Sequence, residues 1–156
     1  MTHPLSLTVN GVPYSLAVDG GRTLLSVLRS EVGLTGTKEG CDDSECGACM
    51  VLLDGRPLNS CSYLALQVDG REVTTVEGLV RDGQPSALQQ ALVEAGGIQC
   101  GFCTPGMLIS ATALLADQPR PSEDEVRLAL AGNLCRCTGY QKIVEAVLTA
   151  AGAGDA

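Results

Sequence analysis

The sequence predicts an α+β fold in which a strand-rich first half precedes a helical second half. Near the N-terminus hydrophobic residues alternate with polar ones, as in half-buried strands, whereas beyond residue 86 they recur at helical spacing. Between the two patterns, Gly78, Gly83 and Pro85 indicate a linker at about residues 77–86. The eight cysteines form two sets of four, one in each half. We therefore expect two domains, residues 1–77 and 78–156, each with its own cysteine quartet.

The first half opens with two alternating runs, residues 5–9 and 12–18, which predict a pair of strands. Asn10-Gly11 lies between them, and this dipeptide is a strong signal for a tight hairpin turn. Thr23 is a suitable N-cap for a short helix over about residues 24–32.

A glycine-bearing loop follows, with four glycines between residues 33 and 49, namely Gly33, Gly36, Gly40 and Gly47. Glycine allows the backbone to curl closely around an object and to point its N–H groups inward. Met50 to Leu53 and the Asp54-Gly55 turn predict a second hairpin, and Glu72 to Val76 a last strand.

Four helices are predicted in the second half. Helical spacing recurs over residues 88–95 and 143–151, and residues 105–116 are apolar almost all round, as in a buried central helix. Ser122-x-x-Glu125 is a capping box at the start of a further helix.

Composition and charge exclude several function classes. The chain has 10 Lys and Arg against 18 Asp and Glu, a formal net charge of −8, no Trp and one Phe. Nucleic-acid binding requires basic patches and usually stacking aromatic residues, so we do not expect it. No run of residues has the length of a membrane-spanning helix. The first ten residues show no secretory signal, so we expect a cytoplasmic protein whose thiols stay reduced.

The first quartet has the spacing Cys41-x4-Cys46-x2-Cys49-x11-Cys61. Its opening matches the plant-type ferredoxin spacing, in which four thiolates hold a 2Fe–2S cluster. A zinc knuckle and a pair of disulfides are the alternatives. A glycine-bearing loop followed by a hairpin argues against both, so we predict a 2Fe–2S site.

The second quartet has the spacing Cys100-x2-Cys103-x31-Cys135-x-Cys137, which on its own fits zinc as well as an iron–sulfur cluster. Its first pair precedes the predicted central helix, with Thr104 expected as N-cap and Pro105 as the first helical residue. The positive end of that helix would face the negative charge of the thiolates.

Three blocks of sequence resemble the iron–sulfur subunit of the molybdenum hydroxylases, the xanthine oxidase family, which includes carbon monoxide dehydrogenase, aldehyde oxidoreductase and 4-hydroxybenzoyl-CoA reductase. The resemblance runs over nearly the whole chain, and no ligand position departs from the pattern. The blocks are Gly40-Cys41-Asp42 with Glu45-Cys46-Gly47-Ala48-Cys49, then Gln99-Cys100-Gly101-Phe102-Cys103-Thr104-Pro105-Gly106, then Gly132-Asn133-Leu134-Cys135-Arg136-Cys137-Thr138-Gly139-Tyr140.

The resemblance implies a β-grasp ferredoxin-like 2Fe–2S domain over residues 1–77 and a four-helix 2Fe–2S domain over residues 78–156. It also implies that the second quartet holds a 2Fe–2S cluster next to molybdopterin, and that Gln99 and Cys137 approach the pterin. Without the resemblance, Gln99 would be read as a loop residue bonded to its own backbone.

By this resemblance the chain is the electron-relay subunit of a molybdenum-containing oxidoreductase. The expected partners are a large subunit with molybdopterin, in its cytosine dinucleotide form, and a medium subunit with FAD, assembled as a dimer of heterotrimers. Single electrons would pass from molybdopterin through the second quartet and then the first to FAD or another acceptor, or in the reverse direction in a reductase.

The chain itself shows no catalytic residues and no substrate site. It has no Gly-rich dinucleotide fingerprint, and its only histidine, His3, lies at the N-terminus. Asp42, Asp43 and Glu45 are expected to form a solvated face or docking rim, and Arg136 either raises the potential of its cluster or points to solvent. A free-standing two-cluster ferredoxin and a zinc-stabilised interaction module are the alternative functions.

Overall fold

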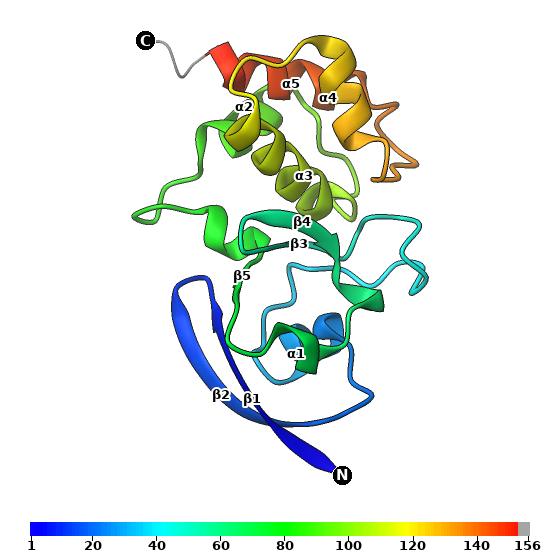
Figure 1. Cartoon of the computed structure of the whole chain (residues 1–156). Helices are drawn as coiled ribbons and strands as arrows, with labels where there is room; N and C mark the ends of the chain where they lie inside the picture. The colour runs from blue at the N-terminus through cyan, green and yellow to red at the C-terminus, as the bar shows by residue number, and fades with distance from the viewer. Residues whose placement is uncertain (153–156) are drawn as a thin grey trace.

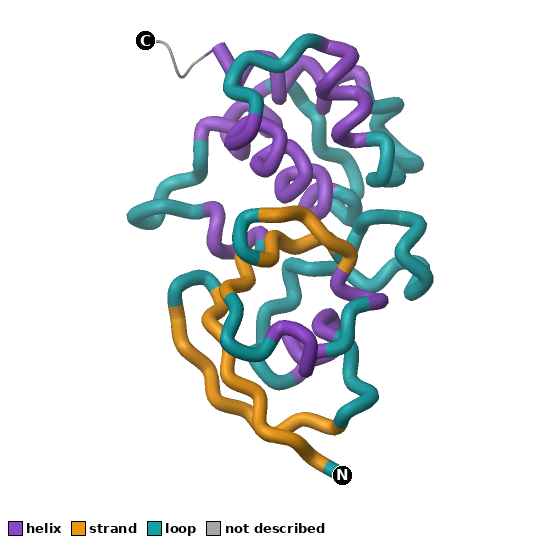
Figure 2. The backbone as a smooth tube through the Cα atoms, viewed as in Figure 1, coloured by secondary structure: helices purple, strands orange, loops and turns teal. Residues whose placement is uncertain are grey.

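The structure, a computed structural model, describes residues 1–152 and confirms the α+β class. Strands gather at the N-terminal end of the molecule, and four of the five helices described gather at the other end (Figures 1 and 2). The strands are β1 (Thr2–Val9), β2 (Val12–Asp19), β3 (Met50–Leu53), β4 (Arg56–Asn59) and β5 (Glu72–Thr74). The helices are α1 (Leu24–Ser30), α2 (Ala87–Glu94), α3 (Thr104–Asp117), α4 (Glu123–Leu130) and α5 (Gln141–Gly152).

The five strands form one mixed sheet in the order β2-β1-β5-β3-β4. Both predicted hairpins are present, with Val9 opposite Val12 in one and Leu53 opposite Arg56 in the other. The turn dipeptide Asn10-Gly11 has φ of 51° and 79°, and Asp54-Gly55 has φ of 47° and 80°. Two positive φ angles in succession are the geometry that favours Asn-Gly and Asp-Gly in tight hairpins. β5 then pairs in parallel with β1 and antiparallel with β3.

The core of the strand-rich half lies between the sheet and α1. Thr23 caps α1 as predicted, because its hydroxyl accepts the Ser26 N–H at 3.2 Å. Buried side chains from both layers meet here, namely Leu5, Leu7, Val9, Val18, Leu24, Val27, Leu28, Val51, Leu53, Ala65, Val68 and Val73. All are aliphatic, as the scarcity of aromatic residues requires.

The core of the helical half is built around α3. The first half of this helix is buried from Pro105 to Ala111, in agreement with its apolar sequence. Ser122 and Glu125 form the predicted capping box of α4, and Ser86 and Gln89 form another on α2. The prediction that Thr104 caps α3 is wrong: Cys103 is the N-cap, and its carbonyl already accepts the Met107 N–H at 3.0 Å. The helix therefore begins one residue earlier, with Pro105 in its second position.

The two halves meet where α3 packs against the β3–β4 hairpin (Figure 1). Leu52 of β3 belongs to the same apolar cluster as the helices. The segment between the halves starts with a 3₁₀ turn at Val76–Leu79, whose Leu79 is buried in the helical core. Glu77 accepts the Gly36 N–H at 2.7 Å, so this turn is also tied to the glycine-bearing loop.

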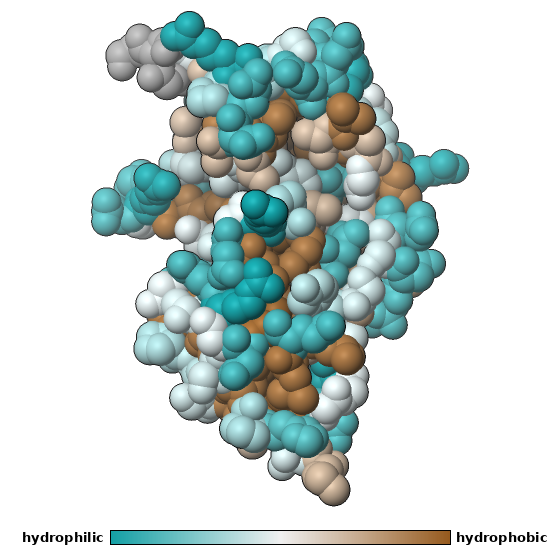
Figure 3. Space-filling view, viewed as in Figure 1, coloured by the Kyte–Doolittle hydropathy of each residue, from teal (hydrophilic) through white to brown (hydrophobic). Residues whose placement is uncertain are grey.

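The surface carries no continuous apolar band on the face shown in Figure 3, where brown patches alternate with hydrophilic side chains over both halves. Within residues 1–152 no helix combines the length and apolarity needed to cross a membrane.

The central position of α3 generates a stability prediction. Ile109 is 0% exposed, whereas Leu128 on α4 is 77% exposed. Ile109→Ala is expected to lower the free energy of unfolding by about 2–5 kcal/mol because it leaves a cavity in a close-packed core. Leu128→Ala, which removes similar apolar volume from the surface, is expected to change it by no more than about 0.5 kcal/mol. Urea denaturation followed by circular dichroism measures both, and equal effects would contradict the packing described here.

Candidate metal centres

The first cysteine quartet lies on an irregular loop whose shape depends on left-handed backbone positions. Between α1 and β3 the residues with positive φ are Gly33, Asp42, Ser44 and Gly47, at 81°, 60°, 66° and 70°. Two of these are not glycine, and such residues tolerate positive φ only at an energetic cost. The chain thus turns sharply on both sides of Ser44, which brings Cys46 back beside Cys41.

The four thiols of this quartet interact with one another. The Cys46 N–H donates to Cys41 Sγ at 3.4 Å, and the thiol of Cys49 interacts with those of Cys46 and Cys61. Cys49 and Cys61 are 2% and 4% exposed and pack with Leu25 of α1. Cys61 reaches the site from the 3₁₀ turn Ser60–Ser62, which directly follows β4. The quartet is therefore closed from beyond the hairpin, as the sequence predicts.

The thiols of the first quartet differ in pKa. Burial raises the pKa of Cys49 to about 12. Cys41 differs, since the Asp43 side chain raises its pKa but main-chain N–H groups of Asp43 and Cys46 outweigh this and lower it overall. Without a cation the Cys49 thiol keeps its proton at neutral pH, and metal binding must release that proton.

The second quartet joins two segments at the N-terminal ends of α3 and α5. Cys100 interacts with Cys137 and Cys135, and Cys103 interacts with Cys135 and Cys100. Cys103 is the N-cap of α3, and Cys135 and Cys137 lie on the turn that leads into α5. Cys100 and Cys137 are exposed, whereas Cys103 and Cys135 are half-buried. This site is therefore more open to solvent than the first.

Hydrogen bonds single out Cys135 within the second quartet. Its Sγ lies 3.0 Å from Thr138 Oγ1 and accepts the Thr138 N–H at 3.4 Å. Burial opposes ionisation of Cys135, but these bonds prevail and lower its pKa to about 7. Burial dominates at Cys103 and raises the pKa of that thiol to about 12.

Tyr140 fixes the turn that carries Cys135. Its hydroxyl accepts the Cys135 N–H at 2.7 Å, and its backbone has a φ of 69°, which is costly for an aromatic residue. Sequence reasoning assigned no role to Tyr140 or to Thr138, although both belong to the third motif block. The signal available was their short distance along the chain from Cys135 and Cys137.

The donor set of each site fits an iron–sulfur cluster. Among residues 1–152, no three His, Cys, Asp or Glu side chains form a group that could hold a single metal ion. A 2Fe–2S cluster does not need such a group, because each of its irons takes only two of the four thiolates. The thiols of each quartet interact with one another. Each site offers four thiols with main-chain N–H groups directed at sulfur. A Cβ on Gly40 would lie 2.7 Å from Cys46 Sγ, so glycine keeps this side of the first site open.

The remaining predicted site residues lie at the surface. Gln99 is exposed and directly precedes Cys100, whose thiol interacts with that of Cys137. Arg136 is also exposed. Asp42, Asp43 and Glu45 are exposed around the first quartet, in agreement with a solvated face or rim.

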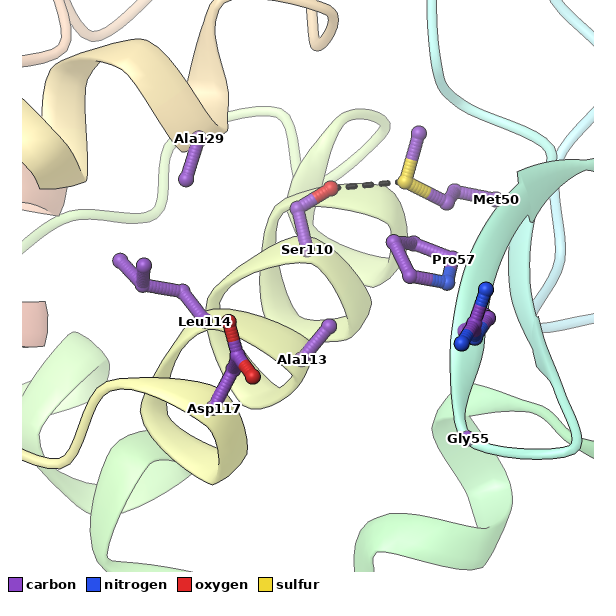
Figure 4. A pocket seen from close by; sticks show the side chains of 9 residues that line it. Met50, Gly55, Pro57, Ser110, Ala113, Leu114, Asp117 and Ala129 are labelled. Carbon is purple, nitrogen blue, oxygen red and sulfur yellow. Dashed lines mark hydrogen bonds between the residues drawn. The ribbon is translucent and has the colours of Figure 1, made fainter.

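A groove of about 560 Å³ is lined by residues of the β3–β4 hairpin, α3 and α4 (Figure 4). Apolar side chains such as Pro57, Ala113 and Leu114 line it, together with Arg56, Ser110 and Asp117. No cysteine lines this groove, so it is distinct from both thiol sites.

Comparisons with known proteins agree with the thiol sites. Residues 75–148 match the family described as 2Fe–2S binding domain. The chain is 49% identical over 143 residues to the nicotinate dehydrogenase small FeS subunit of Eubacterium barkeri, covering 92% of this chain and 91% of that one. It is 49% identical over 150 residues to the xanthine dehydrogenase iron–sulfur-binding subunit of Escherichia coli O157:H7, covering 94% and 93%.

A solved structure shows the same fold. Quinoline 2-oxidoreductase from Pseudomonas putida 86 superimposes with a TM-score of 0.95 at 46% identity, over 99% of this chain and 96% of that chain. Sequence and structure together confirm the predicted resemblance, and this chain belongs to the iron–sulfur subunits of the molybdenum hydroxylases, the xanthine oxidase family of oxidoreductases.

Proposed function

We propose that this chain relays single electrons through two 2Fe–2S clusters between a molybdopterin site on a large partner subunit and FAD, or another acceptor, on a further partner. The observation that carries the proposal is the presence of two separate networks of four thiols in one chain. Membership of an iron–sulfur subunit family implies electron transfer. When bound, each cluster would accept and release one electron through its irons.

In this proposal Cys41, Cys46, Cys49 and Cys61 hold the first cluster, and Cys100, Cys103, Cys135 and Cys137 hold the second. The main-chain N–H groups of Cys46 and Thr138 donate to ligand sulfurs, which stabilises the more negative reduced state. The chain's own residues thus set the potentials and exclude water around the buried thiols.

In this proposal the second site faces molybdopterin. Its thiols Cys100 and Cys137 are exposed, and so are three apolar residues within two positions of its cysteines. These are Ile98, Phe102 and Leu134, at 38%, 46% and 58%. Exposed apolar surface of this kind is typical of a protein interface. It favours a permanent complex over a free-standing ferredoxin, which would diffuse with this surface in water.

The finer features of the assembly follow from the family resemblance. Residues 1–77 would form a β-grasp domain and residues 78–156 a helical domain, which is compatible with the separate apolar clusters of the two halves. Relatives whose names describe them as small subunits support a multi-subunit complex. We propose a cytoplasmic dimer of heterotrimers with molybdopterin cytosine dinucleotide on the large subunit and FAD on the medium subunit.

Iron content and electron paramagnetic resonance test the proposal directly. The chain, purified with the subunits that accompany it, is expected to hold about four irons and to give two distinct rhombic signals on stepwise reduction, because each quartet supplies the four thiolates of one 2Fe–2S cluster. Zinc in place of iron would exclude electron transfer, and two irons with one signal would show that one quartet has another role.

The hydrogen bonds to Cys135 generate a second prediction. Thr138→Val keeps the main-chain N–H but removes the hydroxyl 3.0 Å from Cys135 Sγ. A hydrogen bond contributes roughly 0.5–1.5 kcal/mol, so the reduction potential of the second cluster should fall by about 20–60 mV. Redox titration followed by electron paramagnetic resonance measures the shift. Thr138→Ser, which retains a hydroxyl, is the matched control and should keep a reduction potential close to that of the wild type. An unchanged potential in Thr138→Val would contradict the role assigned to the Thr138 hydroxyl at Cys135 Sγ.

A further inference from the structure

The two cysteine sites approach each other through three backbone segments in close contact. A Cβ on Gly47, which follows Cys46, would lie 2.3 Å from the Gly132 carbonyl oxygen. A Cβ on Gly106, in the first turn of α3, would lie 2.1 Å from the Gly47 carbonyl oxygen. Since real side chains are not found at such distances, only glycine fits at these two positions. The segments that carry Cys46, Cys103 and Cys135 are therefore in direct backbone contact.

Asn133 fills the centre of this contact. Its residue is 2% exposed, and its Nδ2 donates to the Gly47 carbonyl oxygen at 3.1 Å. Its Oδ1 accepts from Ser110 Oγ at 2.6 Å, and Ser110 Oγ also lies 2.7 Å from Met50 Sδ (Figure 4). The carbonyl of a side-chain amide is the better acceptor for the single hydroxyl proton. The amide of Asn133 therefore has a fixed orientation, with its donor toward the first site.

A main-chain hydrogen bond beside Asn133 connects the two sites directly. The N–H of Leu134 donates to the carbonyl oxygen of Cys46 at 2.9 Å. Leu134 is bonded to Cys135, so a route from Cys46 to Cys135 consists of one hydrogen bond and otherwise only covalent bonds. Both ends of this hydrogen bond are held by Asn133, which precedes Leu134 in the chain and binds Gly47, the residue after Cys46.

We infer that Asn133 is a positioning residue for electron transfer between the two cysteine sites, because it holds the hydrogen bond between Leu134 N–H and the Cys46 carbonyl at bonding distance. This inference rests on the proposed relay function. One electron moves from the Cys135 side, which is oxidised, to the Cys46 side, which is reduced. No bond is made or broken, and the electron originates from the molybdopterin side of the proposed complex.

The test is Asn133→Asp in the chain purified with its partner subunits. Aspartate keeps an acceptor for Ser110 but replaces the donor to Gly47 with a carboxylate oxygen, which the Gly47 carbonyl repels. Iron content and the two separate resonance signals are expected to stay as in the wild type. The magnetic splitting between the two reduced centres should change, and electron transfer between them after rapid partial reduction should slow by about tenfold or more, on the scale at which misplacement acts on reaction rates.

Amide hydrogen exchange gives a readout that needs no electron transfer. The Leu134 amide should exchange at least about tenfold faster in Asn133→Asp, because it is protected only while its hydrogen bond is closed. Asn133→Ser, which is uncharged but too short to span the same gap, is the second variant and should show the same changes. It provides the test if Asn133→Asp does not assemble.

A control variant separates positioning from stability. Val126→Ala destabilises the helical half at a fully buried position on α4, away from the contact between the two sites, and should leave the splitting and the transfer rate as in the wild type. Wild-type splitting and rate in both Asn133 variants would overturn the inference while leaving the relay function intact. A wild-type protein without two resonance signals would overturn the relay function and the inference with it.

Discussion

The close approach of the Cys46–Gly47 backbone to α3 and to Asn133 determines how the two halves of this molecule fit together. Gly47 and Gly106 permit this approach because neither has a Cβ, and the buried amide of Asn133 supplies the polar partner that the Gly47 carbonyl needs in a dry environment. The Met50 N–H also donates to the Gly47 carbonyl, so β3 begins where this contact ends. This contact therefore positions the β3–β4 hairpin, α3 and both thiol sites relative to one another.

Each thiol site combines buried sulfurs with sulfurs that receive hydrogen bonds. Burial raises the pKa of Cys49 and Cys103, so these thiols favour the neutral form until a cation arrives. Thr138 lowers the pKa of Cys135, so that thiol is close to ionisation at neutral pH. When such a site binds a metal, its buried thiols release their protons, and metal binding in turn stabilises the fold around the site. The positive φ angles at Asp42 and Tyr140 are compatible with that design, since a bound group would offset their conformational cost.

Local features were predictable from the sequence, whereas contacts between distant segments were not. Asn10-Gly11, Thr23 and the Ser122 capping box each act within a few residues, and all three were predicted correctly. The capping box of Ser86 and Gln89 carries the same signal and was overlooked. The position of β5 between β1 and β3 depends on pairing across the chain, which periodicity does not encode. The role of Asn133 has no local signal, because its partners Gly47 and Ser110 are remote in sequence.

The unequal burial of the two sites indicates how such a subunit is assembled. In the first site, Cys49 and Cys61 are enclosed by this chain's own hairpin and by α1, so the chain provides most of the cover itself. In the second site, Cys100 and Cys137 are exposed beside Ile98, Phe102 and Leu134. The apolar shell around a metal site controls solvent access, and apolar side chains gain from burial, so a single partner surface over this region would affect both. In the proposed relay, this open second site is the one that a partner subunit covers. Electrons would then enter on the helical half and leave from the strand-rich half.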